Sequence, residues 1–436
     1  MNINIKKVLK FLLIFILIFC INYFIITFPN DEYLIYGFSY NITKGLIPYV
    51  DYNMVILPFH SLFIGSLMMI FGNSYLIYHL ICATLETIII YFLTRKLNIF
   101  KSFILVISTV VFDPYSYNVF IGLIIAMILL IEVNDYKHKD ILIGLLIGYI
   151  MMTKINIGAF IFLAYFIKSN KKVEAFLYCS IIPVITLLYL CFSNSLFECI
   201  DYCILGLKNF RGNLSIELPY VILAIIYIIY VIYKYYKTKD KNYYYLIAYS
   251  IMFYPILGFY HLSIVFWVLF YYLFLSLKSK ENIIMVYTLL SILSLFYIRL
   301  HVPYNNVKLD FLGNRRIVIF DQVPKYAKYI KENYRTKKIY IFEIDAYLMK
   351  LEAGVPINKY DLINRGNMGH DDLLYLDEID KTCNKEECVI LSSMQAFNYG
   401  KTQLIPEFKD YLLKNYYLCE DDFVYCEIEK TCSIHR

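Results

Sequence analysis

The sequence predicts a polytopic α-helical membrane domain with about eleven transmembrane helices at residues 1–300. A C-terminal extracytoplasmic α/β domain is expected at residues 301–436. Of the 436 residues, 60% are hydrophobic and 17% are charged, and the mean hydropathy is +0.58. Soluble domains average about 45–50% apolar and about 25% charged residues. Residues 1–300 hold 22 Lys+Arg and 14 Asp+Glu, whereas the shorter remainder holds 19 and 21. This uneven charge distribution predicts a membrane part followed by a soluble part.

The first apolar run, Val8–Phe28, meets the requirement of roughly 20 residues for a bilayer-spanning helix. Lys6, Lys7 and Lys10 flank its start, so a secretory signal peptide is the alternative interpretation. No small-residue cleavage site follows the run, and many apolar runs come later. We therefore expect a retained signal-anchor.

Ten further apolar runs are expected to span the membrane, and several of them are short. They are Tyr75–Leu93, Ser102–Phe112, Tyr115–Glu132, Ile141–Met152, Ile157–Ile167, Ala175–Phe192, Pro219–Tyr233, Tyr243–Phe259, Leu262–Leu277 and Ile283–Ile298. Leu57–Phe71 is also apolar, but Pro58, His60 and Gly65 within it favour an interfacial or re-entrant helix.

The cations between these runs follow the positive-inside rule when the N-terminus is placed in the cytoplasm. Alternating loops then hold 17 cations on the inside, and five remain outside: Lys44, Lys154, Lys208, Arg211 and Arg299. The C-terminal domain is therefore expected outside. Because the basic excess lies in the membrane part, it is topology signal, and nucleic acid is not expected as a partner.

The tail alternates short apolar strands with helices, as in a small α/β domain. Strands are expected at Arg316–Phe320, Lys338–Phe342 and Cys388–Leu391, and helices at Val323–Tyr334, Asp371–Asp380 and Leu404–Asn415. Tyr416–Cys419 and Phe423–Ile428 are expected to form a hairpin flanked by Cys419 and Cys426. An outside location permits disulfides, and zinc is disfavoured because no His pair or CxxC accompanies these cysteines.

The longest outer segment of the membrane part, residues 29–74, holds acidic side chains at the membrane boundary. Asp31 and Glu32 follow the first span, and Gly45-Leu46-Ile47-Pro48-Tyr49-Val50-Asp51 lies further on. Acidic groups at this boundary are costly unless they are solvated or used. The alternative is that Asp31 and Glu32 only cap the outer end of a helix.

Two later outer turns hold further candidates. Asp113 lies in Phe112-Asp113-Pro114-Tyr115, where Asp-Pro is also an ordinary turn signal. Lys154 lies in Thr153-Lys154-Ile155-Asn156, a tight turn where an anionic lipid headgroup would reach. Its alternative role is that of a snorkelling lysine.

Taken together in order, these motifs resemble the GT-C glycosyltransferases. The similarity is to the branch with protein O-mannosyltransferases, lipid A aminoarabinose transferases and their bacterial homologues. The motifs that carry it are Asp31-Glu32, the Gly-x-x-Pro-Tyr-x-Asp stretch, Asp113 and the Thr-Lys turn. They cover roughly Val8–Phe192, and the remainder matches by architecture only.

The resemblance implies transfer of a sugar from a polyprenyl-phosphate carrier to an acceptor at the outer membrane face. It makes Asp31 the candidate general base for inverting attack and Asp113 a second acid that orients acceptor or sugar. Lys154 would hold the lipid phosphate, with Arg211 and Arg299 as further cations. Glu32, Asp51 and His261 complete the substrate-binding candidates, although a lone histidine such as His261 is more often structural.

The sequence departs from the family at two points. It lacks the extended signatures of the eukaryotic mannosyltransferases and a metal-binding Asp-x-Asp in the first outer loop, so no metal or other cofactor is assigned. The acceptor is expected to be a cell-envelope glycan, a lipid or a protein. A glycan-lipid transporter or flippase would place polar groups near mid-membrane in repeated halves, whereas the polar candidates here cluster at one face and no repeated halves are apparent. A non-catalytic membrane scaffold is the third interpretation.

Overall fold

The computed structural model describes 5–24, 30–95, 97, 102, 105–107, 116–134, 136–206, 209, 218–254, 257–276, 322–334, 338–343, 346–363, 367–383, 388–392, 406–420 and 424–427. The chain divides into two compact units. Unit 1 comprises Met1–Gly45, Leu57–Tyr189 and Leu214–Ile319; unit 2 comprises Leu46–Ile56, Leu190–Asn213 and Phe320–Arg436. The expected boundary at residue 300 lies outside the described residues, and two earlier segments fold with the C-terminal one.

Unit 1 is helical. Its elements are α1 (Ile5–Phe24), α2 (Asn30–Thr43), α3 (Phe59–Phe71), α4 (Tyr75–Thr94), α6 (Tyr117–Asn134), α7 (Lys139–Met151), α8 (Ile155–Lys168), α9 (Lys172–Phe192), α11 (Leu218–Thr238), α12 (Tyr243–Tyr249), the 3-10 helix η3 (Ser250–Phe253) and α13 (Phe259–Ser276). Most of these match the expected apolar runs to within a few residues. The last residues of α9 belong to unit 2.

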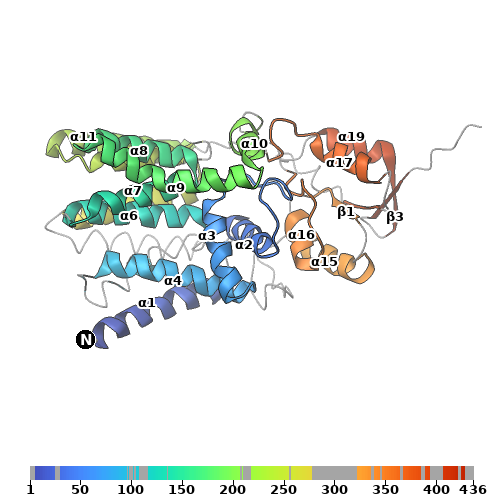
Figure 1. The fold of residues 1–436 in the computed structure, drawn as a ribbon, viewed down its shortest axis with the longest axis horizontal. Helices are drawn as coiled ribbons and strands as arrows, with labels where there is room; N and C mark the ends of the chain where they lie inside the picture. The colour runs from blue at the N-terminus through green and yellow to red at the C-terminus, as the bar shows by residue number, and fades with distance from the viewer. Residues whose placement is uncertain are drawn as a thin grey trace, which may run out of the picture. The chain divides into compact units, whose positions relative to one another are not determined.

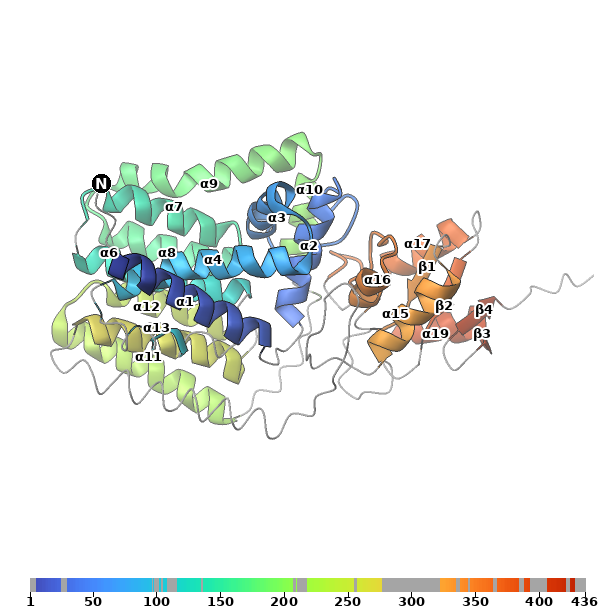
Figure 2. The same ribbon diagram turned by 90° about the horizontal axis from the view of Figure 1, so that it is seen from below.

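Four of the described helices, α4, α6, α9 and α11, are long and apolar enough to cross a membrane, which indicates a multi-pass membrane protein. The long helices of unit 1 lie alongside one another in a bundle, and α2 and α3 lie at one end of it (Figure 1, Figure 2). Within it α1 packs on α4, α6 contacts both α4 and α13, and α8 contacts α7 and α12. α6 is the most buried of the four long helices, because 72% of its residues are buried.

Small residues let two of these helices approach closely. A Cβ added at Gly144 of α7 would lie 2.3 Å from the Cβ of Tyr178, and one at Gly148 would lie 2.8 Å from the Cys179 carbonyl oxygen. Glycines four residues apart on one helix face are a common device for close helix contact in membranes. The α7–α9 contact therefore depends on the absence of side chains at both positions.

Three expected segments differ from a simple span. The run Tyr243–Phe259 is helical only to Phe253, because Tyr254 precedes a proline and adopts an extended conformation (φ −121°, ψ 139°). α7 and α8, with 13 and 14 residues, reach about 20 Å, short of a hydrocarbon core of about 30 Å. The expected runs Ser102–Phe112 and Ile283–Ile298 lie largely or wholly outside the described residues.

The C-terminal part of unit 2 contains a four-stranded sheet with strand order β1-β2-β4-β3. β1 (Lys338–Ile341) is parallel to β2 (Cys388–Leu391), while β4 (Val424–Glu427) is antiparallel to β2 and to β3 (Tyr416–Glu420). Its helices are α15 (Gln322–Asn333), α16 (Ala346–Ala353), α17 (Leu374–Cys383) and α19 (Pro406–Asn415). Phe342, Tyr375 and Phe408 lie at the centre of an aromatic core between sheet and helices.

The hairpin and the strand Cys388–Leu391 are confirmed, whereas the expected strand Arg316–Phe320 lies outside the described residues. Helix α16 was not predicted. Unit 2 also contains α10 (Leu196–Ile200) and the π-helix η1 (Asp201–Leu205). A disulfide joins Cys383 to Cys388. Cys419 and Cys426 lie on the paired strands β3 and β4, and their side chains are outside the described part of the chain.

Candidate functional site

The predicted site residues fall into three groups. The side chains of Glu32, Lys154 and His261 are described in unit 1, and that of Asp51 is described in unit 2. Asp31 lies in the first turn of α2, and its side chain is outside the described part of the chain. The remaining three predicted residues, Asp113, Arg211 and Arg299, lie outside the described residues altogether.

Lys154 occupies the turn between α7 and α8 and is the residue that caps the start of α8. Its Nζ donates a hydrogen bond to Oδ1 of Asn118 at 3.0 Å and lies 5.6 Å from the ring centre of Tyr117. Sδ of Met252 is 3.8 Å away. Side chains from α6 and η3 therefore contact this ammonium and fix its position beside the start of α8.

Two further contacts fix the surroundings of this turn. The backbone N–H of Phe59, at the start of α3, donates to the Met152 carbonyl oxygen at 3.1 Å. The hydroxyl groups of Ser116 and Tyr260 are hydrogen-bonded to each other, which ties the start of α6 to the start of α13. His261 follows in the first turn of α13, close enough for its imidazole to experience the charge of the Lys154 ammonium.

Three helices therefore begin around Lys154: α6 at Tyr117, α8 at Ile155 and α13 at Phe259. The first N–H groups of a helix lack intrahelical partners, and the helix dipole places partial positive charge there. Together with the Lys154 ammonium, these starts favour a negatively charged ligand such as a phosphate. This group, Lys154 with Tyr117, Asn118 and His261, is called the Lys154 cluster below.

Glu32 lies in a second polar cluster between α2 and α4 and is fully buried. Its Oε1 accepts a hydrogen bond from the Tyr75 hydroxyl and lies 3.1 Å from Nε2 of His79. The Tyr78 hydroxyl donates to the Glu32 carbonyl oxygen at 3.4 Å. These contacts hold the first turn of α2, which also carries Asp31.

Asp51 is exposed in the loop Leu46–Ile56 of unit 2. Its Oδ2 accepts a hydrogen bond from the Ile47 backbone N–H at 2.6 Å. The carboxylate thereby closes its own turn, where Pro48 and Tyr52 form a bridge. Asp51, predicted as a substrate-binding residue, therefore stabilises its own turn in the structure.

Sequence reasoning missed the neutral partners that position the charged residues. Asn118 and Tyr117 open an apolar helix and resemble ordinary boundary residues, and their role depends on the fold of α6 against the α7–α8 turn. His79 was not among the predicted site residues. Its position one helical turn after Tyr75 was the one local signal that both face the same neighbour.

No family model and no curated protein sequence matches the chain. Similar solved structures include the archaeal oligosaccharyltransferase AglB from Archaeoglobus fulgidus in complex with an inhibitory peptide and a dolichol-phosphate. It is 11% identical, with a TM-score of 0.46, and the match covers 99% of this chain and 75% of that chain. The A. fulgidus oligosaccharyltransferase in complex with Zn and sulfate is 12% identical, with a TM-score of 0.46, and the match covers 96% of this chain and 73% of that chain. Its apo form is 13% identical, with a TM-score of 0.47, and the match covers 98% of this chain and 75% of that chain. Similarity at this level does not identify a family.

Proposed function

We propose that this chain is a membrane glycosyltransferase that moves a sugar from a polyprenyl-phosphate carrier to a cell-envelope acceptor at the outer membrane face. The observation that carries the proposal is the Lys154 cluster. The half-buried ammonium of Lys154 lies at the starts of three helices. Such a site suits a lipid phosphate, which must be bound and whose negative charge must be stabilised as it leaves. The resemblance of the outer motifs to GT-C enzymes points to the same substrate class.

In the proposed reaction, the acceptor hydroxyl oxygen attacks the anomeric carbon while the bond from that carbon to the phosphate oxygen breaks. The bonding pair stays with the phosphate, and the configuration at the anomeric carbon inverts. Asp31 takes the hydroxyl proton, a role worth about 10²–10⁴-fold in rate. Lys154 stabilises the phosphate, and Glu32, held by Tyr75 and His79, positions the turn that carries Asp31.

Four further predicted residues keep the roles that the resemblance gives them in this proposal. Asp113 orients acceptor or sugar, and Arg211 and Arg299 add positive charge for the donor. His261 contributes to donor binding beside Lys154. No metal or other cofactor is assigned in this mechanism.

The test uses the purified full-length protein in nanodiscs with a labelled polyprenyl-phosphate sugar and membrane extract from a deletion strain. Lys154→Met is expected to lower transfer about 10²–10³-fold, as for loss of one group that stabilises developing negative charge. Lys154→Arg is expected to retain more of the rate than Lys154→Met. Lys44→Met is the matched control, because Lys44 is another expected outer cation and is exposed.

Asp31→Asn is expected to lower the rate about 10²–10⁴-fold with little change in donor affinity. Undiminished transfer in Asp31→Asn would remove Asp31 from the base role. Equal transfer in Lys154→Met and Lys44→Met would remove Lys154 from the phosphate site. If the same protein reconstituted in sealed vesicles moves labelled lipid across the membrane but no sugar is transferred, the protein is a transporter and the proposal is wrong.

A further inference from the structure

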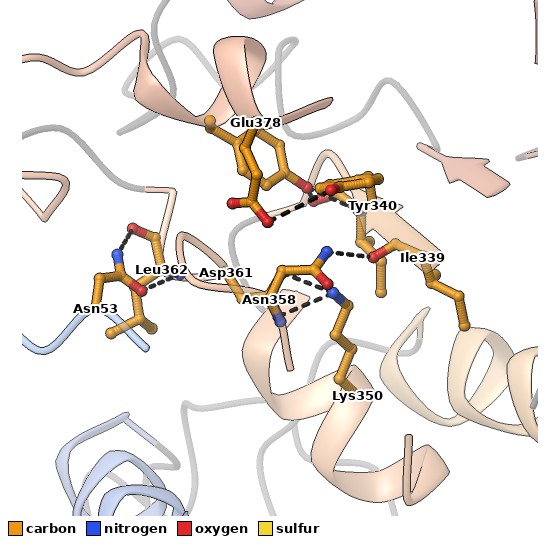
Figure 3. A network of polar contacts seen from close by, with 10 residues as sticks. Asn53, Ile339, Tyr340, Lys350, Asn358, Asp361, Leu362 and Glu378 are labelled. Atoms are coloured by element: carbon orange, nitrogen blue, oxygen red, sulfur yellow. Dashed lines mark hydrogen bonds and ion pairs between the residues drawn. The ribbon is translucent and has the colours of Figure 1, made fainter. Parts of the chain in front are cut away.

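The described part of the loop 358–370 of unit 2, residues 358–363 and 367–370, is fixed at its beginning by a buried ion pair. Nζ of Lys350, on α16, lies 2.8 and 2.9 Å from the two carboxylate oxygens of Asp361. The Asn358 backbone N–H donates to Asp361 Oδ2 at 2.6 Å, and its side chain donates to the Ile339 carbonyl oxygen of β1 at 2.8 Å (Figure 3). The loop therefore starts from a fixed point on the sheet and on α16.

Asn53, more than 300 residues earlier in the sequence, holds the middle of the loop. Its Nδ2 donates to the carbonyl oxygens of Leu362 and Asn367 at 2.9 and 3.1 Å, and its Oδ1 accepts from the Leu362 N–H at 3.2 Å. The side chain of Asn53 is buried, and Figure 3 shows it facing Leu362. A buried amide with several partners fixes the backbone groups that it binds, here those of Leu362 and Asn367, because their displacement leaves polar groups unpaired.

Asp201, the first residue of the π-helix η1, holds the end of the loop. Its Oδ1 accepts hydrogen bonds from the His370 backbone N–H at 3.2 Å and from His370 Nδ1 at 2.8 Å. Asn209 Nδ2 donates to the His370 carbonyl oxygen at 2.9 Å. Gly369 has φ +82°, and a Cβ there would lie 2.1 Å from Asp201 Oδ2, so this approach requires glycine.

This arrangement orients the His370 imidazole. An ionised carboxylate only accepts hydrogen bonds, so Nδ1 of His370 carries the proton and Nε2 keeps its lone pair when the ring is neutral. The His370 side chain is 60% exposed, whereas that of Asp201 is 21% exposed. The ring is thus fixed at one nitrogen and accessible at its other edge. Short π-helical segments such as η1 are frequent at functional sites.

We propose that Asp201 and His370 form an acceptor-binding site, in which Nε2 of His370 accepts a hydrogen bond from a hydroxyl group of a glycan. The proposal rests on the proposed function, because it assigns this site to the glycan that receives the sugar. The ligand class follows from the chemistry: a neutral imidazole nitrogen with a lone pair binds hydroxyl donors. Asp201 acts as the positioning residue that sets the tautomer and direction of the ring.

The experiment measures protection of His370 from diethyl pyrocarbonate, which acylates the unprotonated imidazole nitrogen, in the full-length protein in nanodiscs. Peptide mass spectrometry gives the modification rate of His370 relative to exposed His138, which is the internal control. The probe is a wall-glycan and glycolipid extract of a deletion strain. We expect it to slow modification of His370 about three- to tenfold, the value of one hydrogen bond. Periodate-treated extract, whose vicinal hydroxyls are destroyed, is expected to give no protection.

Two variants separate binding from folding. Asp201→Asn keeps the size of the side chain but loosens the ring, and is expected to abolish protection while the modification rate of His138 stays unchanged. His370→Ala is expected to raise the KM for the acceptor about three- to tenfold with an unchanged KM for the donor, whereas His138→Ala changes neither. An unchanged acceptor KM in His370→Ala overturns the proposal.

The outcomes also separate this proposal from the proposed function. Transfer that proceeds with an extract giving no protection overturns the His370 site alone. Protection without any sugar transfer supports a glycan-binding site and removes the transferase function. Absence of both transfer and protection overturns both proposals.

Discussion

Replacement of Lys350 by methionine is expected to destabilise unit 2 by about 3–5 kcal/mol, the usual cost of breaking a buried ion pair. Lys350 and Asp361 have side-chain exposures of 0% and 1%. Methionine fills a similar volume but leaves the Asp361 carboxylate buried with the Asn358 N–H still bound to it. The cost therefore comes from an uncompensated negative charge rather than from a cavity.

Burial disfavours the charged forms of both Lys350 and Asp361. Burial lowers the pKa of Lys350 and raises the pKa of Asp361, while the attraction between the two charges opposes both shifts. Removing both charges together should therefore be much less harmful than removing one. We expect the double variant Lys350→Met with Asp361→Leu to recover at least half of the lost stability, since apolar replacements of whole buried pairs are often neutral or stabilising.

Hydrogen exchange of the β1 and β2 amides in the full-length protein measures this free energy. A loss of about 3–5 kcal/mol corresponds to about 10²–10⁴-fold faster exchange through unit opening. Lys171→Met is the matched control, because Lys171 forms an exposed pair with Glu174 at 3.1 Å whose loss should not be measurable. A loss below about 1 kcal/mol in Lys350→Met, or a double variant no better than the single one, would refute this reasoning.

Three further predictions concern neighbouring features. Burial and the Asp361 charge raise the pKa of the Glu378 carboxyl above its usual value of 4.5. The folded state therefore binds the carboxyl proton more tightly than the unfolded state, and stability falls as the pH rises from the usual pKa to the raised one. Glu378→Gln should flatten this dependence and raise stability at pH 7, as measured by denaturant unfolding. Asn53→Ala should cost about 1–3 kcal/mol locally, measured by exchange of the loop amides that it binds. Gly158→Ala should sharply lower sugar transfer, because its Cβ would lie 2.3 Å from the Met151 Cα beside the Lys154 turn. Gly258→Ala, which meets nothing within 4 Å, should leave transfer unchanged.

Elements with strong local signals were predictable from the sequence. The apolar run Tyr75–Leu93 matches α4 within one residue, since Ser74 caps the helix and accepts a hydrogen bond from the Ile77 N–H. The strand Cys388–Leu391 coincides with β2, because a short run with two β-branched residues follows a polar stretch of the sequence. In both cases the deciding interactions lie within a few residues in sequence.

The candidate site was predictable only at its charged member. Lys154 was conspicuous as a rare cation at an expected outer turn, but its partner Asn118 lies 36 residues away in sequence. Lys350 and Asp361 were not singled out at all, because lysine and aspartate side chains normally remain solvated. Only the packing of α16 against the loop removes both groups from water.

The division of the chain into two units also depends on contacts between residues that are far apart in the sequence. Residues 29–74 form one outer segment in the sequence, yet Leu46–Ile56 folds with unit 2 while α2 and α3 belong to unit 1. The side chain of Asn53 makes this possible, since it supplies both a donor and an acceptor to loop amides 309 residues away. A polar side chain inside an expected membrane-domain loop thus contributes to the C-terminal fold. His370 lies at the end of the loop that Asn53 binds. Loss of the Asn53 contacts should therefore also change the orientation of the His370 imidazole in the proposed acceptor site.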